Sequence, residues 1–340
     1  MARLADPALS AEYHFWLGRT FSVTGFRDRA VAAGERALAE ARRAGDEALI
    51  GKAHHVLGYE CYFSGALPEG VRHAREAVAH LSRTDERYWL ASAYWVLALN
   101  HGPIGDFDAS LEALARTVEI ADAMQDPKLQ SAADWTAGSV YALRGDWDRG
   151  VETARRGLDR SPNPLNTALA MGFLGAIYFE KGDMAEAIPL LEKAIAQMGA
   201  FRALEMQAWL SSVLGEAHLV AGDAARARAI LTEATRMSAQ VRYWWGIGWA
   251  ERALGRVALA TGAPDKARPH LDAALAAMEG AGARFEVART RLVLARAVHV
   301  LGDAAAAGQH LAEAQEVFAA SRSPFYVEQA RAIAREFGLP

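Results

Sequence analysis

Residues 57–65 read LGYECYFSG, and this pattern of a leucine, a small residue, aromatic residues and a closing glycine decides the fold. It returns as LGAIYFEKG at residues 174–182. The closing glycine occurs eight times, at successive spacings of 40, 40, 40, 37, 40, 40 and 40 residues. The eight positions are Gly25, Gly65, Gly105, Gly145, Gly182, Gly222, Gly262 and Gly302. A fixed period of this length indicates a repeat architecture.

Each repeat predicts two antiparallel helices that meet at the glycine, which can adopt the left-handed conformation that ends a helix. A small residue stands seven positions before each glycine and another stands twelve after it, so neighbouring helices can approach closely. Such a pair cannot bury its apolar faces alone, and the units must therefore stack. In five units an aspartate follows the glycine and can cap the second helix. These are Asp106, Asp146, Asp183, Asp223 and Asp303.

The composition agrees with a helical array and excludes several other classes. The chain has 340 residues, of which 52% are hydrophobic and 74 are alanine, the residue with the lowest cost in a helix. This apolar fraction excludes disorder, and a single cysteine, Cys61, excludes a disulfide scaffold. The net charge of −4 gives no electrostatic footprint for nucleic acid.

Targeting signals are also missing from the sequence. No basic segment followed by an apolar one opens the chain, and no apolar run approaches the ~20 residues of a membrane span. A lone cysteine suits a reducing compartment. We therefore expect a cytoplasmic protein that does not insert into a membrane.

The repeated unit resembles the tetratricopeptide repeat. The resemblance rests on a Leu-Gly-x-x-aromatic core, as in Leu17-Gly18 with Phe21 and Leu174-Gly175 with Tyr178, and on the downstream alanines. It covers about residues 11–320. The unit departs from the family in lacking its tryptophan four positions before the small residue, and in a period of 40 rather than about 34 residues.

The resemblance implies an all-α fold, a right-handed α-solenoid (superhelix) of about eight antiparallel helix pairs whose first helices line the concave surface. Units of this length are similar to the sensor arrays of large bacterial regulators, such as the maltose-regulator type and related multidomain ATPases. They also resemble peptide and adaptor scaffolds of eukaryotes.

The chain divides into an array of eight helical hairpins over residues 1–322 and a C-terminal capping helix over residues 323–340, one side of which is polar. Three residues are missing between units four and five, where two prolines, Pro162 and Pro164, disfavour a helix. Residues 160–165 are therefore either a shorter loop or a hinge. The first unit lacks a comparable cap, which is compatible with a fragment of a longer protein, a capless protein or an edge covered by a partner.

The small residue of each first helix sets the register of the concave face, where large aromatic and arginine side chains suit recognition of a partner. The candidate peptide- or partner-binding residues are Phe15, Tyr59, Tyr62, Trp95, Trp135, Phe179, Trp209, Trp249, Arg252, Arg256, Arg289 and Arg296. The arginines place positive charge at the C-terminal part of the groove. The alternative is that the aromatics are packing residues and the arginines are solvated or ion-paired side chains.

Catalytic and metal motifs are not found in the sequence. Gly246-Ile247-Gly248 lacks the third glycine of a dinucleotide site, and Gly51-Lys52 lacks the hydroxyl residue of a phosphate-binding loop. The histidines lack the spacing of metal ligands on one helical face. We expect no enzyme activity, no cofactor and no metal.

We expect a non-catalytic scaffold whose concave groove binds a protein or peptide segment, with an apolar anchor and an acidic group, and no nucleic acid directly. The alternative is a ligand- or partner-sensing module of a bacterial transcriptional regulator or signalling ATPase, separated from its effector domain. A third possibility is self-assembly through the uncapped N-terminal edge or through the aromatic surfaces, and the oligomeric state stays open.

Overall fold

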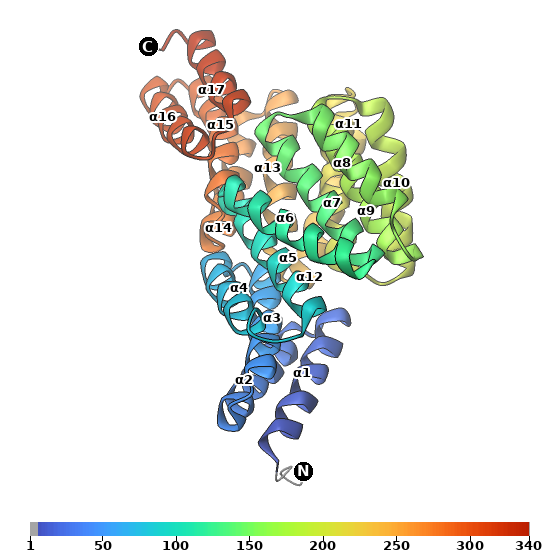
Figure 1. Ribbon diagram of the computed structural model, residues 1–340. Helices are drawn as coiled ribbons and strands as arrows, with labels where there is room; N and C mark the ends of the chain where they lie inside the picture. The colour runs from blue at the N-terminus through green and yellow to red at the C-terminus, as the bar shows by residue number, and fades with distance from the viewer. Residues whose placement is uncertain (1–5, 340) are drawn as a thin grey trace.

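The computed structural model describes residues 6–339, and this part of the chain forms seventeen α-helices and no strand (Figure 1). The first eight are α1 (Pro7–Val23), α2 (Arg27–Ala44), α3 (Glu47–Ser64), α4 (Leu67–Leu81), α5 (Arg87–Ile104), α6 (Phe107–Met124), α7 (Pro127–Arg144) and α8 (Trp147–Asp159). The others are α9 (Pro164–Lys181), α10 (Met184–Ala200), α11 (Leu204–Val220), α12 (Ala224–Gln240), α13 (Trp244–Ala260), α14 (Pro264–Gly280), α15 (Arg284–Val300), α16 (Ala304–Ala320) and α17 (Pro324–Glu336).

The repeat glycines close the first helix of each hairpin, as the sequence predicts. All eight have a positive φ, for example +79° at Gly65 and +87° at Gly182, which a residue with a side chain adopts only at a cost. Three of the five expected aspartate caps form, because Asp183, Asp223 and Asp303 each accept a bond from an amide of the following helix.

The expected side-chain cap is wrong for the two remaining aspartates. Asp106 and Asp146 occupy the residue before α6 and α8 but accept no capping bond there. The Asp106 carboxylate instead lies 3.3 Å from His101 and 3.2 Å from Arg284 of α15. A distant part of the chain therefore competes with the local amides for this side chain.

Small residues let the two helices of a hairpin approach closely. A Cβ built on Gly138 of α7 would lie 2.8 Å from the carbonyl oxygen of Gly150 in α8. A Cβ on Gly150 would in turn lie 2.9 Å from the carbonyl oxygen of Gly138. These separations leave no room for a side chain, so the glycines set the spacing of the two helices.

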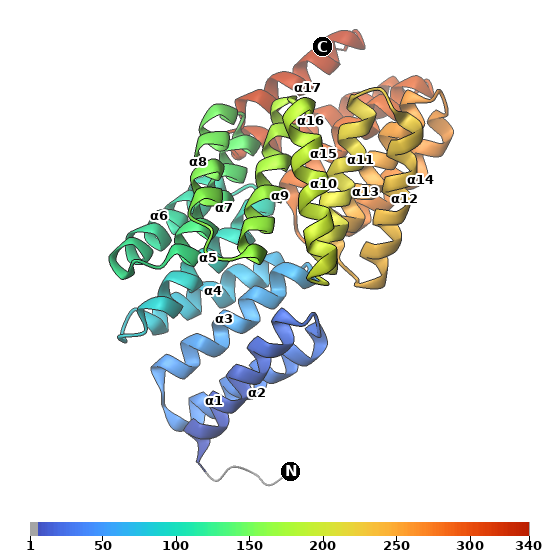
Figure 2. The same ribbon diagram turned by 90° about the vertical axis from the view of Figure 1, so that its right-hand side faces the viewer.

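Consecutive hairpins stack side by side, and the stack winds into a superhelix whose ends lie at opposite ends of the molecule (Figures 1 and 2). The structure confirms the all-α solenoid, while its handedness stays a prediction. α7 and α8 both pack on α9, so the stack continues across residues 160–163. A hinge at residues 160–165 stays a prediction.

The superhelix winds tightly enough for successive turns to touch. α3 contacts α13, α5 contacts α15, and α7 contacts α17. We call this line of contacts the seam. Its ion pairs repeat along the chain: Asp28 binds Arg242 at 2.7 Å and Asp108 binds Arg322 at 2.7 Å, each over 214 residues. The repetition follows because each turn advances by the same number of units.

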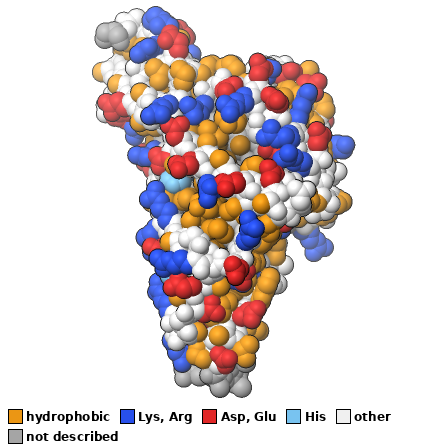
Figure 3. Space-filling view, in the orientation of Figure 1, with side chains coloured by type: hydrophobic (Ala, Val, Ile, Leu, Met, Phe, Trp, Pro, Cys, Tyr) orange, Lys and Arg blue, Asp and Glu red, His pale blue; other side chains and the backbone are white. Residues whose placement is uncertain are grey.

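The surface carries both signs of charge. Lysine and arginine side chains alternate with aspartate and glutamate over the face shown in Figure 3, with apolar patches between them. No helix within residues 6–339 is long and apolar enough to cross a membrane.

Candidate functional site

Three cavities lie along the inner side of the superhelix, and their walls come mainly from the first helices of the hairpins. The N-terminal cavity has a volume of about 510 Å³ and is lined by Tyr59, Tyr62, Phe63, Trp95, Trp135 and Phe173, among others. Exposed apolar side chains stand at the same cavity: Val23, Leu165, Phe201 and Leu204. This cavity therefore offers a predominantly aromatic wall with an apolar rim.

A smaller cavity of about 80 Å³, which we call the aromatic chamber, adjoins it. The two share Tyr62, Leu99, Trp135 and Phe173 as wall residues. Trp209, Trp245 and Trp249 complete the aromatic lining, and Glu180 and Glu286 lie in its wall as well. The volume is below the ~150 Å³ of a cavity that admits benzene, so the chamber suits a small aliphatic group.

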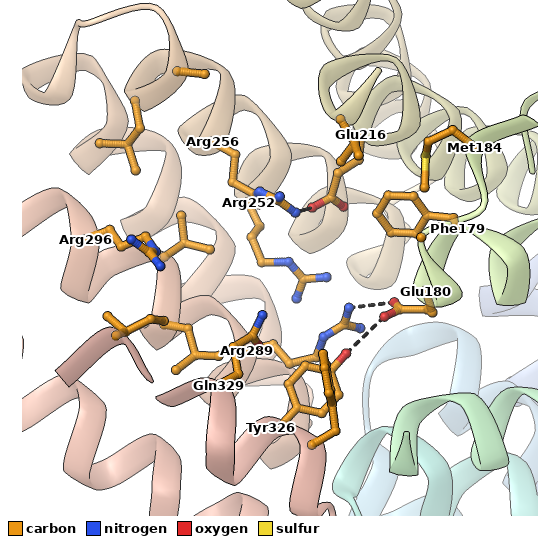
Figure 4. A pocket seen from close by; sticks show the side chains of 18 residues that line it. Phe179, Glu180, Met184, Glu216, Arg252, Arg256, Arg289, Arg296, Tyr326 and Gln329 are labelled. Atoms are coloured by element: carbon orange, nitrogen blue, oxygen red, sulfur yellow. Dashed lines mark hydrogen bonds and ion pairs between the residues drawn. The ribbon is translucent and has the colours of Figure 1, made fainter. Parts of the chain in front are cut away.

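The C-terminal cavity has a volume of about 590 Å³ and shares Glu180 with the chamber. Its wall runs from α9 through α11, α13 and α15 to α17 (Figure 4). Four arginines and two glutamates line it: Arg252, Arg256, Arg289, Arg296, Glu180 and Glu216.

A buried ion network crosses the C-terminal cavity. Arg289 of α15 binds Glu180 of α9 at 2.6 Å and Glu286 at 3.1 Å, and Tyr326 of α17 donates its hydroxyl to Glu180 at 3.0 Å (Figure 4). Arg252 of α13 binds Glu286 at 2.6 Å. The network therefore ties three first helices, α9, α13 and α15, and the last helix, α17, together around one space.

The charges of this network stabilise one another. Burial alone would raise the pKa of the Glu286 carboxyl, but Arg289 and Arg252 outweigh burial and hold that pKa below its ordinary value. Burial would likewise lower the pKa of the Arg289 guanidinium, but Glu180 and Glu286 hold it well above its ordinary value. Glu286 and Arg289 therefore stay charged although they are removed from water.

Cation–π contacts connect the ion network to the chamber. The guanidinium carbon of Arg252 lies 4.7 Å from the ring centre of Trp249, and that of Arg289 lies 5.0 Å from it. Trp249 therefore forms the boundary between the aromatic and the charged parts of the site.

Arg27 makes a corresponding bridge at the N-terminal cavity. It binds Glu60 of α3 at 3.2 Å and Glu205 of α11 at 3.0 Å, and its guanidinium carbon lies 3.9 Å from the ring centre of Phe63. Glu205 belongs to the next turn of the superhelix, 178 residues away. Arg27 thus joins the cavity wall to the seam.

The structure gathers the predicted groove residues along this one inner surface, with a single exception. Tyr59, Tyr62, Trp95 and Trp135 line the N-terminal cavity, Trp209 and Trp249 line the chamber, and Phe179, Arg252, Arg256, Arg289 and Arg296 line the C-terminal cavity. Phe15 instead packs against Trp89, with ring centres 4.9 Å apart, and lines none of the three. The binding role of all twelve stays a prediction.

The sequence predicts positive charge at the C-terminal end of the groove, but each of the four arginines there forms an ion pair with a glutamate. Arg252 pairs with Glu286, Arg256 with Glu216, Arg289 with Glu180 and Arg296 with Glu336. The sequence does not reveal the partner of Arg289, because Glu180 lies 109 residues away from it. Phe173, Trp245 and Tyr326 are further wall residues that lie outside the register used for the prediction.

Several polar atoms around the cavities are buried without a hydrogen-bond partner among residues 6–339. They are Nε1 of Trp135, Trp209 and Trp249, Nη2 of Arg252 and Oε2 of Glu216. Within the same described residues, no group of three or more His, Cys, Asp and Glu side chains is arranged to hold a metal ion.

The repeats match known proteins at the level of family. Family models for the tetratricopeptide repeat match residues 136–203 and residues 178–247. Together with the eight units and the stacked hairpins, these matches make the chain a tetratricopeptide repeat protein. No curated protein matches its sequence.

Solved structures share the fold over most of the chain. A Rap protein in complex with the competence and sporulation factor is 12% identical, with a TM-score of 0.65, over 97% of this chain and 99% of that one. The Rap conjugation gene regulator of plasmid pLS20, in complex with the Phr* peptide, is 14% identical with a TM-score of 0.65, over 83% and 79% of the two chains.

A signal transduction ATPase with a tetratricopeptide repeat sensor, from Pyrococcus horikoshii, is 14% identical with a TM-score of 0.54. The likeness covers 96% of this chain and 49% of that one. The array thus resembles those of bacterial regulators and of signalling ATPases in its fold.

Proposed function

We propose that the chain is a non-catalytic scaffold that binds a peptide or a protein segment along the three cavities. The observation that carries the proposal is the common wall. Eleven of the twelve residues chosen by their register and side-chain type come from separate repeats and line adjoining cavities, with aromatic side chains at one end and charged ones at the other. Large aromatic and arginine side chains are the usual anchors of recognition surfaces. The Phr* peptide bound to a protein of the same fold supports this proposal.

The ligand is proposed to carry an apolar anchor and an acidic group. The anchor would occupy the aromatic chamber, whose wall is almost free of charge apart from Glu180 and Glu286. The acidic group would lie at the outer part of the C-terminal cavity, near Arg256 and Arg296, whose side chains are 40% and 42% exposed. There, a carboxylate could replace a glutamate as the partner of either arginine.

The array is proposed to comprise residues 1–322, with residues 323–340 as its cap, and to flex at residues 160–165. The lone cysteine supports a cytoplasmic location. Because each repeat contacts its neighbours, a ligand that spans several repeats can favour one pitch of the superhelix over another.

Binding can be tested with a library of capped peptides presented to the full chain and identified by mass spectrometry. The double variant Trp135→Ala with Trp209→Ala should lose at least ten-fold in affinity for the selected peptides, because both indoles form the chamber wall. Trp16→Ala is the matched control, since Trp16 is 53% exposed and lies outside the three cavities. Failure of every peptide to bind, or unchanged affinity in a double variant of native helicity, would contradict the proposal.

The alternative function is that of a sensing module, favoured by the likeness to the repeat sensor of the signal transduction ATPase. A sensor must change shape when it binds. Small-angle scattering of the chain with and without a selected peptide would distinguish the two, because a change in maximum dimension supports a sensor and an unchanged profile supports a plain scaffold.

A further inference from the structure

Two side chains in the wall of the C-terminal cavity each carry one buried polar atom without a partner. Arg252 donates to Glu286 through Nη1, whereas its Nη2 bonds to no described residue. Glu216 pairs with Arg256 through Oε1, whereas its Oε2 bonds to no described residue. Both side chains are 3% exposed. Buried donors and acceptors without partners cost free energy, so the two atoms favour a ligand that satisfies them.

The two atoms line the same cavity and have opposite hydrogen-bonding roles. Arg252 extends from α13 toward the middle of the cavity, and Glu216 projects into it from the neighbouring helix α11 (Figure 4). The guanidinium can only donate and the ionised carboxylate can only accept. A matching ligand group therefore presents an acceptor to Arg252 and a donor to Glu216, as a trans peptide group can when it lies between the two side chains, because its carbonyl and its N–H point in opposite directions.

A peptide group has this combination in its carbonyl oxygen and its N–H. A carboxylate lacks the donor and an ammonium group lacks the acceptor. The inner wall also favours an uncharged group, because Arg252, Arg256 and Arg289 already have the glutamate partners Glu286, Glu216 and Glu180. A charged ligand group at this depth would leave the local charges unbalanced.

We propose that Arg252 and Glu216 together bind one main-chain peptide group of the ligand. Nη2 of Arg252 donates to the carbonyl oxygen, and Oε2 of Glu216 accepts from the N–H. This inference rests on the proposed function and deepens it. Because Arg252 stacks on Trp249, which lines the aromatic chamber, the bound peptide group lies beside the chamber and sets the register of the apolar anchor.

The assignment can be tested on the native chain with a series of peptides in which one main-chain amide at a time is replaced by an ester (an ester walk). The probe is the tightest-binding member of a hexapeptide library with acetyl and methylamide caps and with no Asn or Gln, so that only main-chain amides are offered. Each amide is replaced in turn by an ester, which removes the N–H and weakens the carbonyl as an acceptor. We expect one position to lose at least ten-fold in affinity and the others to lose less than three-fold.

Variants then locate the partner of the sensitive amide. In Glu216→Leu the acceptor is gone, so the sensitive ester should bind no more than two-fold weaker than the peptide itself, while Glu216→Gln restores part of the difference. Arg252→Lys keeps a cation beside Glu286 but removes the second guanidinium N–H. It should weaken the peptide and the insensitive esters alike and the sensitive ester less, because the carbonyl of that ester is already a poorer acceptor. Glu336→Leu is the control, because Glu336 pairs with Arg296 outside the inner wall and is 55% exposed.

Each outcome is decisive. One sensitive position that disappears in Glu216→Leu supports the assignment. A flat ester walk, or a sensitive position that persists in Glu216→Leu, overturns it and leaves the proposed function standing. If the peptide with a free C-terminal carboxylate binds more tightly than the capped peptide, and this gain depends on Arg252, the group bound there is a carboxylate and not a peptide group. If no library member binds, the proposed function fails together with the assignment.

Discussion

Trp244 of α13 donates its indole N–H to the main-chain carbonyl oxygen of Tyr62 in α3, at 2.8 Å and across 182 residues. Tyr62 lies in the last turn of its helix, where carbonyl groups lack partners within the helix. The bond therefore satisfies a helix end in one turn of the superhelix with a side chain from the next. The seam consequently contains specific polar contacts in addition to packing.

Trp244→Phe should destabilise the fold, because it keeps an aromatic ring in the seam but leaves the Tyr62 carbonyl oxygen without its donor. We expect a loss of about 1–3 kcal/mol in the free energy of unfolding, measured by urea denaturation. Trp209→Phe is the control, since the Trp209 indole N–H is buried without a partner and its removal breaks no bond. Equal losses in the two variants would contradict a stabilising role of this bond.

Gly145→Ala should cost more than Gly222→Ala, although the φ angles of the two glycines are +89° and +91°. Both variants suffer the strain of a left-handed residue, about 1–2 kcal/mol. At Gly145 the new Cβ would also lie 2.7 Å from Cβ of Phe325, whereas at Gly222 no described atom lies within 4 Å. The loss in free energy of unfolding should be about 1–3 kcal/mol larger for Gly145→Ala than for Gly222→Ala, measured by thermal or urea unfolding. This difference reports the contact of Gly145 with Phe325 across the seam. Matching melting temperatures would show that the turns do not touch there.

Arg289→Met should be strongly destabilising, because it leaves the buried Glu286 carboxylate and the largely buried Glu180 carboxylate without a shared cation. Breaking a buried ion pair in this way costs about 3–5 kcal/mol. Arg296→Met removes an arginine from the same helix whose pair with Glu336 is half exposed, and should cost only about 0–1 kcal/mol. Denaturant titrations of the two variants side by side give the comparison, and similar losses would refute the importance of the network.

Acid should destabilise the protein through His54. Its Nδ1 lies 2.8 Å from Nδ1 of His73, and burial, followed by the nearby His73 and Arg42, lowers the pKa of His54 to about 3. The unfolded chain takes up this proton near pH 6.5, so it binds more protons than the folded chain between about pH 6.5 and pH 3. Stability is therefore greatest above that window and falls as the pH is lowered through it.

The variant His54→Phe isolates this contribution. Between pH 7 and pH 5 the native chain should lose about 2 kcal/mol more than the variant, measured by urea denaturation at each pH. Unfolding at pH 8, where the histidine is neutral in both states, serves as the control for packing changes. Parallel pH profiles of the two proteins would exclude His54 as the source.

The sequence predicts the local structure well because each hairpin is determined by residues within its own repeat. The glycine period, the left-handed turn at Gly65 and the cap at Asp223 all depend on residues within a few positions of one another. The same holds for the inner surface, since the register of one first helix places Trp135 or Trp209 correctly in the wall.

Contacts between successive turns of the superhelix cannot be predicted from a single repeat. The partner of Asp106 is Arg284, 178 residues away, and it is set by the pitch of the whole superhelix rather than by any unit. The glutamate partner of Arg289 is hidden for a similar reason, because Glu180 meets it across the cavity from 109 residues away. A period reveals which residues are equivalent, but it does not reveal the number of units in a turn.

The seam also changes how an occupant of the cavities would leave. In an open spiral, a bound chain escapes sideways from the groove, and its dwell time depends on the residues it contacts. Here α3 with α13, α5 with α15 and α7 with α17 stand against one another along that flank. Sideways escape requires these turns to separate, so the contacts between turns would lengthen the lifetime of a complex in addition to the contacts with the ligand itself.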